Sequence, residues 1–275
     1  MLDNLPTVSL AEWHARILNH AEGNHDSKIP PLPSRAIQEQ FVGSSLKPAF
    51  EEAFIFYSTF MEYSAALGMP FSAPYSRFLD FGCGWGRFLR YAMNDFERMQ
   101  LFATDIDPAI IDACVQAGIP AQYEVLQPLG KLPYPDEFFS HAIGYSVFTH
   151  LPENVHLNWS AEIIRVLKPG GLFCGTIETR KFLEFIQTMP DVDRCTNDWH
   201  RALSRYKPQT TSLLKDYDAG KFVYLPTGGG GVRTTDIYGE AVISPKYIET
   251  TWHGVSLRAV LDERFWQTVF IVQKN

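Results

Sequence analysis

The spacing of hydrophobic positions along this chain changes near residue 77. Upstream, apolar side chains recur every three or four residues, which predicts helices over residues 7–22 and 48–68, with a proline-rich extended connector at 26–34. Downstream, short apolar runs alternate with amphipathic segments, as strands and helices do around a parallel sheet. The predicted strands span residues 77–80, 100–104, 121–125, 141–145 and 172–177, and the helices between them span 87–94, 108–117 and 154–167.

This alternation stops between residues 180 and 240. The region holds a helical stretch near 181–188, a polar and aromatic stretch from 198 to 217, and four consecutive glycines, Gly228–Gly231. The glycine run predicts either a mobile loop that closes over a substrate or a simple flexible connector.

A regular pattern returns at the end of the chain. The remaining predicted elements are a helix at 245–252 and strands at 255–261 and 266–272. We therefore predict an α/β protein with an N-terminal helical segment, residues 1–74, followed by a Rossmann-like domain, residues 75–275. A cap inserted after the fifth strand, at about 180–243, interrupts that domain.

Composition and charge exclude several classes of partner, membrane segment and cysteine site. The net charge is −7, whereas a general nucleic-acid-binding surface usually needs a basic excess, so no nucleic-acid partner is expected. The most apolar stretch, residues 54–67, contains Glu62 and is too short to cross a bilayer. The start of the chain lacks the basic and apolar regions of a signal peptide. The four cysteines are widely separated, which favours reduced thiols in a cytoplasmic protein over a zinc site or a disulfide framework.

The turn after the first predicted strand carries the strongest chemical signal. Asp80 ends the strand, and Gly82, Gly84 and Gly86 alternate with other residues before an amphipathic segment. Glycines let the backbone lie against a ligand where a Cβ would clash. A dinucleotide fold would place a pyrophosphate here, and Asp80 would repel it. The acid instead favours a ligand with a cationic group, such as the ammonium and sulfonium groups of S-adenosylmethionine.

Asp105 directly follows the second predicted strand. A nucleoside with a free ribose diol needs a carboxylate at this place to accept hydrogen bonds from two hydroxyls. An aspartate after a strand more often caps the next helix, but Asp107, immediately before Pro108, suits that role better. We therefore assign Asp105 to the ribose.

Five segments resemble, in the right order, the successive motifs of class I S-adenosylmethionine-dependent methyltransferases. The segments are residues 80–86, 103–107, 131–139, 145–152 and 165–171. The resemblance covers roughly residues 75–178. It implies a seven-stranded, mostly parallel sheet with helices on both faces, whose last strand pair includes one antiparallel strand. It also implies S-adenosylmethionine as methyl donor and S-adenosylhomocysteine as product.

The resemblance further implies individual contacts with the cofactor. The turn residues and Asp80 would hold the methionine part, and Asp105 would bind the ribose. The remaining contacts implied by the family are Gly82, Cys83, Gly84, Tyr145 and Ser146 for the methionine part, and Ile106, Leu126 and Gln127 for the adenine. Where the family often has an acid, this chain has Gln127, whose side chain can still hydrogen-bond the adenine amino group.

The fourth motif is similar to that of a narrower group often associated with bacterial glycan and secondary-metabolite pathways. Two further segments, residues 40–45 and 238–247, fit the same group. This resemblance implies a sugar, a glycan or a related small molecule as methyl acceptor.

His150 is the candidate general base. A sugar hydroxyl is a poor nucleophile, and a base would add about 10²–10⁴-fold to the rate. His150 lies past the carboxyl end of the fourth strand, where ligands bind in such sheets, and histidine titrates near neutral pH. The alternative is a loop histidine that packs against the following helix. His200 and His253 are weaker candidates.

Other features leave the acceptor open. The aromatic and basic residues 199–207 predict either a solvated helix face or a roof over the acceptor, where rings stack on a sugar and arginines pair with an anion. No histidine pair or acid set has the spacing of a metal site, so metal-independent transfer is expected.

The sequence thus predicts a methyltransferase that O-methylates a sugar, a glycan or a related small molecule. One alternative is an N- or C-methyltransferase acting on a natural-product metabolite. A second is a non-catalytic S-adenosylmethionine-binding partner protein. A nicotinamide dehydrogenase is a third, and Asp80 argues against it. No oligomeric state is predicted.

Overall fold

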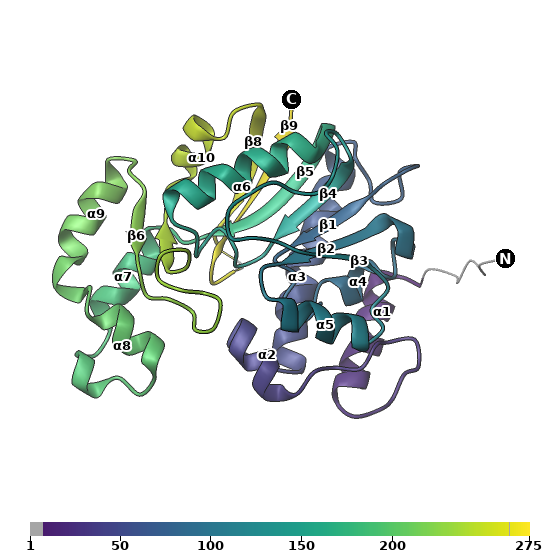
Figure 1. Ribbon diagram of the computed structural model, residues 1–275, viewed down its shortest axis with the longest axis horizontal. Helices are drawn as coiled ribbons and strands as arrows, with labels where there is room; N and C mark the ends of the chain where they lie inside the picture. The colour runs from purple at the N-terminus through teal and green to yellow at the C-terminus, as the bar shows by residue number, and fades with distance from the viewer. Residues whose placement is uncertain (1–7, 264) are drawn as a thin grey trace. The chain divides into compact units, whose positions relative to one another are not determined.

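The computed structural model describes residues 8–263 and 265–275. The start of the first predicted helix, residue 7, lies outside these ranges. The chain divides into two compact units, coloured along the chain in Figure 1. The first unit comprises residues 1–126, 137–143 and 170–172, and the second comprises residues 127–136, 144–169 and 173–275.

Seven strands form one hydrogen-bonded sheet in the order β3-β2-β1-β4-β5-β9-β8. Strand β1 pairs in parallel with β2 and β4, and β2 with β3, whereas β8 and β9 are antiparallel. The strands are β1 Phe78–Phe81, β2 Leu101–Asp105, β3 Gln122–Val125, β4 Phe139–Gly144, β5 Leu167–Ile177, β8 Val255–Leu261 and β9 Thr268–Lys274. Strands β1 and β4 are buried along their whole length, as expected for strands read as continuous apolar runs. The predicted seven-stranded, mostly parallel sheet is confirmed.

The first unit contributes five helices, drawn from purple to blue-green in Figure 1. Ser9 caps the first of these, accepting a hydrogen bond from the Glu12 amide at 3.2 Å. The helices are α1 Leu10–Ala21, α2 Arg35–Val42, α3 Lys47–Ala66, α4 Leu89–Ala92 and α5 Pro108–Gln116, with a 3₁₀ turn at Arg98–Gln100. Helix α2 was not predicted, although Ser34 caps its start and Gly43 ends it in the left-handed conformation.

Helix α4 is much shorter than the predicted segment 87–94. Gly86 has a φ of 75°, which a right-handed helix does not allow, and its amide closes a turn onto the Cys83 carbonyl at 2.9 Å. The helix therefore starts later than the amphipathic pattern indicates.

Arg90 on α4 is fully buried and ties the glycine turn to the N-terminal connector. Its Nη1 donates to the carbonyls of Trp85 at 2.8 Å and Gly86 at 3.0 Å, and its Nη2 donates to the carbonyl of Pro31. Burial lowers the pKa of Arg90 to about 10. The guanidinium holds the turn from inside the protein, a role that the sequence analysis did not identify.

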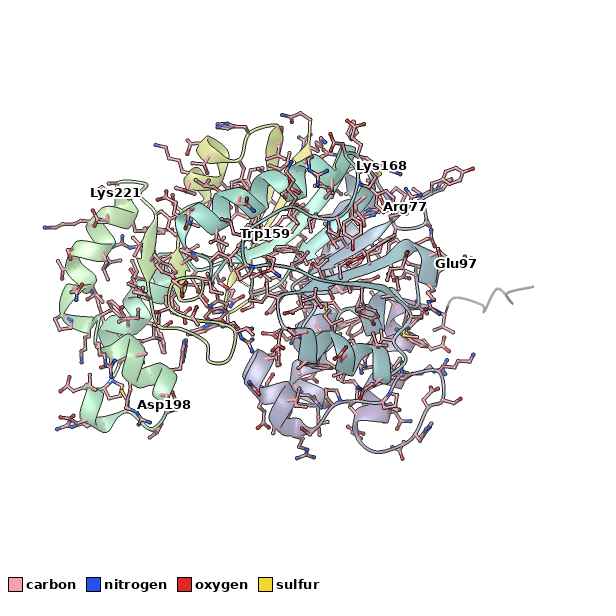
Figure 2. All side chains as sticks on the ribbon, in the orientation of Figure 1. Arg77, Glu97, Trp159, Lys168, Asp198 and Lys221 are labelled. Atoms are coloured by element: carbon pink, nitrogen blue, oxygen red, sulfur yellow. The ribbon has the colours of Figure 1, made fainter. Side chains whose placement is uncertain are left out.

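The second unit contains the region after the fifth strand. Helices α7, α8 and α9, strand β6 and strand β7 pack around their own apolar core, which includes Phe182, Leu203 and Val242. Charged side chains such as Asp198 and Lys221 lie on the outside (Figure 2). The elements of the second unit outside the main sheet are α6 Glu153–Val166, α7 Arg180–Thr188, α8 Asp198–Ser204, α9 Thr210–Asp218, β6 Val223–Leu225, β7 Glu240–Val242 and α10 Pro245–Thr251, with 3₁₀ turns at Val192–Arg194 and Lys207–Gln209.

Strand β5 begins at Leu167, directly after α6, and not at residue 172 as predicted. The Lys274 ammonium donates to the carbonyls of Leu167 at 2.7 Å and Arg165 at 3.3 Å, so the last carbonyls of the helix are satisfied without a loop. None of the described helices is long and apolar enough to cross a membrane.

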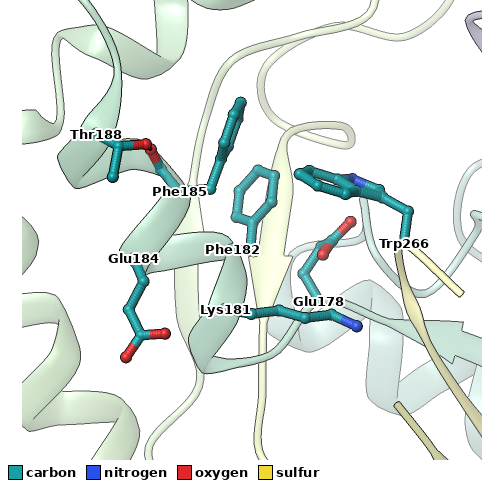
Figure 3. Close-up of a pocket in the computed structure, with 7 residues that line it drawn as sticks. All are labelled: Glu178, Lys181, Phe182, Glu184, Phe185, Thr188 and Trp266. Carbon is teal, nitrogen blue, oxygen red and sulfur yellow. The ribbon is translucent and has the colours of Figure 1, made fainter. Parts of the chain in front are cut away.

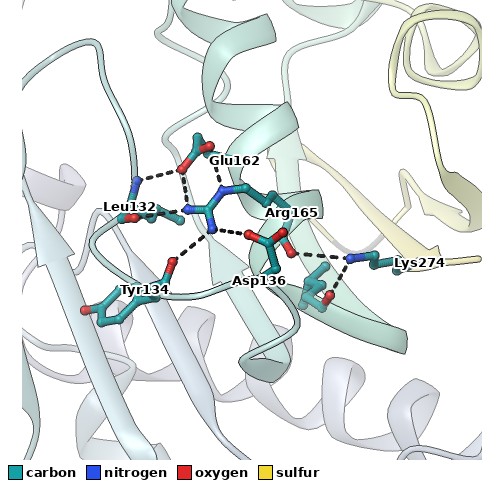
Figure 4. A network of polar contacts seen from close by, with 7 residues as sticks. Leu132, Tyr134, Asp136, Glu162, Arg165 and Lys274 are labelled. Carbon is teal, nitrogen blue, oxygen red and sulfur yellow. Dashed lines mark hydrogen bonds and ion pairs between the residues drawn. The ribbon is translucent and has the colours of Figure 1, made fainter.

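Arg165 connects two of the sequence motifs, residues 131–139 and 165–171. Its guanidinium donates to Glu162 at 2.7 Å, to Asp136 at 2.7 Å and to the Leu132 carbonyl at 3.1 Å, and so anchors the loop before β4 to α6 (Figure 4). Burial alone would raise the pKa of Glu162, but hydrogen bonds from Arg165 and from the Leu132 amide outweigh it and hold that pKa below its ordinary value.

We expect Glu162→Gln to lower the free energy of unfolding by about 1–3 kcal/mol at neutral pH. The folded-state pKa of Glu162 lies below its unfolded value, so the carboxylate stabilises the fold above that value and the stabilisation disappears as pH falls through the folded-state pKa. Urea unfolding of both proteins across this pH range measures the difference. Asp136→Asn is the matched control, because the exposed Asp136 bonds the same arginine and should contribute less than about 1 kcal/mol. A stability difference independent of pH would contradict the assignment.

Candidate functional site

The glycine turn after β1 is held by its own backbone. The amides of Gly82 and Cys83 both donate to the Thr104 carbonyl, at 2.8 and 2.9 Å. Gly82, Gly84 and Gly86 have φ values of 76°, 49° and 75°. A Cβ on Gly86 would lie 2.5 Å from the Ile119 side chain, so glycine is required there both by conformation and by space.

Asp80, at the base of this turn, is a buried carboxylate whose charge is poorly compensated. It is 1% exposed, and its Oδ2 atom has no hydrogen-bond partner among the residues described. Burial, and then the neighbouring Asp105, raises the pKa of Asp80 to about 8, against the opposing effect of Arg87. A cation placed beside Asp80 would restore its ionised form. This geometry fits the positively charged ligand that the sequence predicts.

Asp105 lies at the end of β2 and joins the two loops of the first unit. One carboxylate oxygen accepts from the Gly84 amide at 2.9 Å, and the other accepts from the Asp107 amide at 3.0 Å. Asp107 caps α5 by accepting from the Ala109 amide at 3.0 Å, as predicted. The structure therefore confirms Asp107 as the cap of α5. The assignment of Asp105 to the ribose stays a prediction.

The other predicted cofactor residues of the first unit surround this centre. Ile106 is half-buried, and Leu126 is buried and donates its amide to the Asp105 carbonyl at 2.8 Å. The Cys83 side chain points inward, where a hydrogen bond with Cys114, and then burial, raise the pKa of its thiol. The Cys83 amide donates to the Thr104 carbonyl of β2, and the Cys83 carbonyl accepts from the Gly86 amide. Cys83 therefore stabilises the turn through its backbone.

The second unit holds the predicted residue after β3, Gln127, and the two after β4, Tyr145 and Ser146. Gln127 is exposed, and Tyr145 and Ser146 are half-buried. Ser146 has a φ of 55°, unusual for a residue other than glycine, and its amide donates to Thr176 Oγ1 at 2.7 Å. Its hydroxyl oxygen lies 3.2 Å from His150 Nε2 and accepts from Gln267 Nε2 at 2.9 Å.

His150 is oriented from two sides. Its Nδ1 lies 2.8 Å from the carbonyl oxygen of Gly239, which can only accept, so Nδ1 carries the proton of the neutral ring. Nε2 is then an acceptor that faces the Ser146 hydroxyl. The ring stacks on Tyr238 at 4.3 Å between centroids, and Nδ1 lies 3.4 Å from a carboxylate oxygen of Glu240. This is the tautomer that a general base requires.

The residues of this centre that were not predicted as site residues include Thr176, Glu178, Glu240 and Gln267. Glu178 directly follows β5 and is 3% exposed. Its place at the carboxyl end of a strand could have identified Glu178 from the sequence. The contacts of Gln267 depend on the antiparallel strand β9, and no local sequence pattern indicates them. Among residues 8–263 and 265–275, no three His, Cys, Asp or Glu side chains are grouped to hold a metal ion.

The aromatic and basic stretch 199–207 makes mostly internal contacts. Trp199 Nε1 donates to Glu240 Oε1 at 2.7 Å. Arg201 pairs with Asp198 at 2.6 Å, and Lys207 pairs with Asp191 at 3.2 Å. Arg201 and Lys207 are thus engaged in ion pairs, whereas Trp199 contacts Glu240, the carboxylate beside His150.

Comparisons with known proteins agree with this geometry. Residues 79–175 match the model of a methyltransferase domain family. A solved S-adenosylmethionine-dependent methyltransferase from Clostridium acetobutylicum is 11% identical, covering 80% of this chain and 91% of that one, with a TM-score of 0.54. Another from Mesorhizobium loti is 14% identical, covering 78% and 96%, with a TM-score of 0.51. At these identities the structural likeness shows the fold.

Together, the sheet, the glycine turn and the domain match identify residues 79–175 as part of a methyltransferase domain with the class I fold, the fold of the S-adenosylmethionine-dependent enzymes compared above. The methyltransferase domain family accounts for residues 79–175 of the chain. S-adenosylmethionine is accordingly its cofactor, and the buried, uncompensated Asp80 fits the positive charge of that molecule.

Proposed function

We propose that this methyltransferase transfers the methyl group to a hydroxyl of a sugar, a glycan or a related small molecule. The observation that carries the proposal is the orientation of His150, whose unprotonated Nε2 faces the Ser146 hydroxyl while Nδ1 is held by Gly239. A histidine prepared in this way suits an acceptor whose proton must be removed. An amine that is already neutral, or an acceptor that is already ionised, needs no such base.

The donor site is proposed on the first unit. Asp80 and the turn residues Gly82, Cys83 and Gly84 would contact the methionine part, with Asp80 countering positive charge. Asp105 would accept the ribose hydroxyls. Ile106 and Leu126 are the other proposed contacts on the first unit. On the second unit, Gln127, Tyr145 and Ser146 are proposed as cofactor contacts.

The proposed chemistry is a single displacement. The bound cofactor supplies an electrophilic methyl group on a sulfonium. Transfer of this methyl group to the acceptor oxygen would release S-adenosylhomocysteine, and the residues that hold donor and acceptor in line would contribute most of the acceleration. The acceptor proton passes to His150 Nε2, either directly or through the Ser146 hydroxyl, which gives up its own proton as it receives one. The Glu240 carboxylate then stabilises the imidazolium that forms.

Two broader features of the protein are part of the same proposal. The segment at about 180–243 acts as the cap that selects the acceptor, which its separate apolar core supports. A cytoplasmic location is proposed from the four cysteines, all free and buried.

The test is a titration followed by a turnover assay. We expect S-adenosylmethionine to bind in isothermal titration and NAD not to bind. In a panel of sugars, phenols, amines and carbon acids, radiolabelled methyl groups should appear on hydroxyl compounds. Labelling of amines or activated carbons alone would favour the N- or C-methyltransferase alternative. Cofactor binding without transfer to any compound would favour a non-catalytic partner protein.

A further inference from the structure

The second unit contains a small open cavity of about 280 Å³ beside the end of β5. Its lining combines aromatic rings with a single deeply buried carboxylate (Figure 3). The lining residues are Glu178, Lys181, Phe182, Glu184, Phe185, Thr188 and Trp266. Ligand pockets usually measure about 300–1,000 Å³, so this one suits a single ring or a short chain.

Glu178 provides the polar end of this pocket. It is 3% exposed, and its carboxylate points toward the rings of Phe182 and Trp266 in Figure 3. Burial, and then the nearby carboxylate of Glu240, raises the pKa of Glu178 well above its ordinary value. A carboxylate in such a place lacks a positive partner that would make its ionised form favourable.

No residue that the structure describes supplies that partner. Lys181 is the cation on the pocket wall, but its three N–H groups are directed to Asp262 Oδ1 at 2.7 Å and to the carbonyls of Asp262 and Phe265 at 3.3 and 3.2 Å. The charged groups that act on Glu178 are the carboxylates of Glu240 and Asp262 and the ammonium of Lys181, so with Glu178 itself the set holds three negative charges and one positive when all are ionised. The local charge favours a cationic ligand.

The aromatic rings provide the other half of a cation site. Trp266 is 58% exposed and meets Phe185 edge-on at 5.3 Å between centroids. The faces of aromatic rings attract organic cations, and tryptophan attracts them best. An exposed tryptophan that rims a pocket with a buried acid inside is the arrangement expected for a ligand with an ammonium group on an apolar frame.

The pocket is connected to the centre around His150 through one side chain. Gln267 hydrogen-bonds Glu178 and donates to Ser146 Oγ at 2.9 Å, and Ser146 in turn lies 3.2 Å from His150 Nε2. The Gln267 carbonyl oxygen is buried and has no partner among the residues described, so it remains available to a donor on a ligand. A group bound against Glu178 would thus lie close to the proposed base.

We propose that this pocket recognises an organic ammonium group of the methyl acceptor, held between the Glu178 carboxylate and the ring of Trp266. The inference rests on the proposed function, because it makes the acceptor an amino-bearing compound, such as a single amino sugar, whose hydroxyl is methylated. The ammonium is bound and is not itself the site of transfer. Glu178 selects acceptors that carry an ammonium group.

The test measures binding separately from turnover. Isothermal titration of the full-length protein, in the presence of S-adenosylhomocysteine, uses methyl glucosaminide and cyclohexylamine as cationic probes and methyl glucoside as the neutral match. We expect a cationic probe to bind at least about tenfold more tightly than the glucoside. If only the amino sugar binds tightly, the pocket requires a sugar ring as well as an ammonium group. If both cations bind tightly, the ammonium group is sufficient.

Substitutions locate the site. Glu178→Gln, which keeps the shape of the side chain, should weaken binding of the cationic probe about tenfold to a hundredfold and leave the glucoside unaffected. Trp266→Leu should weaken it about twofold to tenfold. Glu184→Gln is the control, because that carboxylate pairs with Arg180 and points away from the rings in Figure 3. Thermal unfolding of each variant confirms that the fold persists.

The result separates the two proposals. Equal binding of charged and neutral probes, no binding of the cations at millimolar concentration, or an unchanged affinity in a folded Glu178→Gln protein would each overturn the ammonium site. If neutral sugars are methylated as readily as amino sugars, the proposed function stands and the ammonium site does not. If a cation binds selectively but no hydroxyl compound is methylated, the ammonium site stands and the proposed O-methylation does not.

Discussion

Replacing Asp105 by alanine should weaken binding of S-adenosylmethionine by about a hundredfold or more. The carboxylate holds the Gly84 amide and the Asp107 amide at 2.9 and 3.0 Å, and we propose that it also accepts the two ribose hydroxyls. A hydrogen bond to a charged group contributes about 1.5–3 kcal/mol, so the loss of two such bonds accounts for this effect. Isothermal titration with S-adenosylmethionine and S-adenosylhomocysteine measures it directly.

Asp107→Ala is the matched control for this experiment. Asp107 lies two residues away and carries the same charge, but its side chain caps α5. Its removal should cost about 1 kcal/mol of stability and leave the cofactor affinity nearly unchanged. If both variants lose affinity equally, the effect comes from disorder of the loop, and Asp105 is not a specific ligand of the ribose.

Replacing His150 by alanine should reduce turnover by about 10²–10⁴-fold while the affinity for S-adenosylmethionine stays nearly constant. The ring is held by Gly239 and Tyr238 with Nε2 directed at Ser146, so its removal takes away the proton acceptor and leaves the glycine turn of the first unit untouched. Single-turnover kinetics with a hydroxyl acceptor separates the loss of chemistry from any change in product release.

His253→Ala provides the comparison. His253 is exposed after α10, and its substitution should leave turnover unchanged. Unchanged turnover in His150→Ala would assign His150 a purely structural role, as a loop residue packed against Tyr238. The O-methylation proposal would then lose the observation that carries it.

The sequence predicted the parts of this protein that depend on local patterns. Strands such as β2 and β5 were found because they contain short apolar runs, and the glycine turn was found because positive φ values at alternate positions demand glycine. Asp107 was recognised as a cap because proline follows it. Each of these signals lies within a few residues of the feature it predicts.

The missed features depend on contacts between distant segments. Helices α8 and α9 lack strong apolar periodicity, because they cover a small core with only a few residues each. In the sequence, Arg90 resembles an exposed helix residue. Its burial depends on the distant connector at Pro31, whose carbonyl accepts from its guanidinium. The approach of Gln267 to Ser146 joins residues 121 positions apart, and no local pattern records it.

The bond from Trp199 to Glu240 has a consequence for how such an enzyme changes its acceptor. Glu240 has one oxygen engaged by the indole of α8, and the other lies 3.4 Å from His150. Tyr238 and Gly239, which stack on and orient the same imidazole, belong to the inserted segment as well. With His150 as the proposed base and residues 180–243 as the proposed cap, exchanging that segment for the one of a relative would change the surroundings of the base together with the recognition surface. Substrate range and proton transfer would then change in a single step.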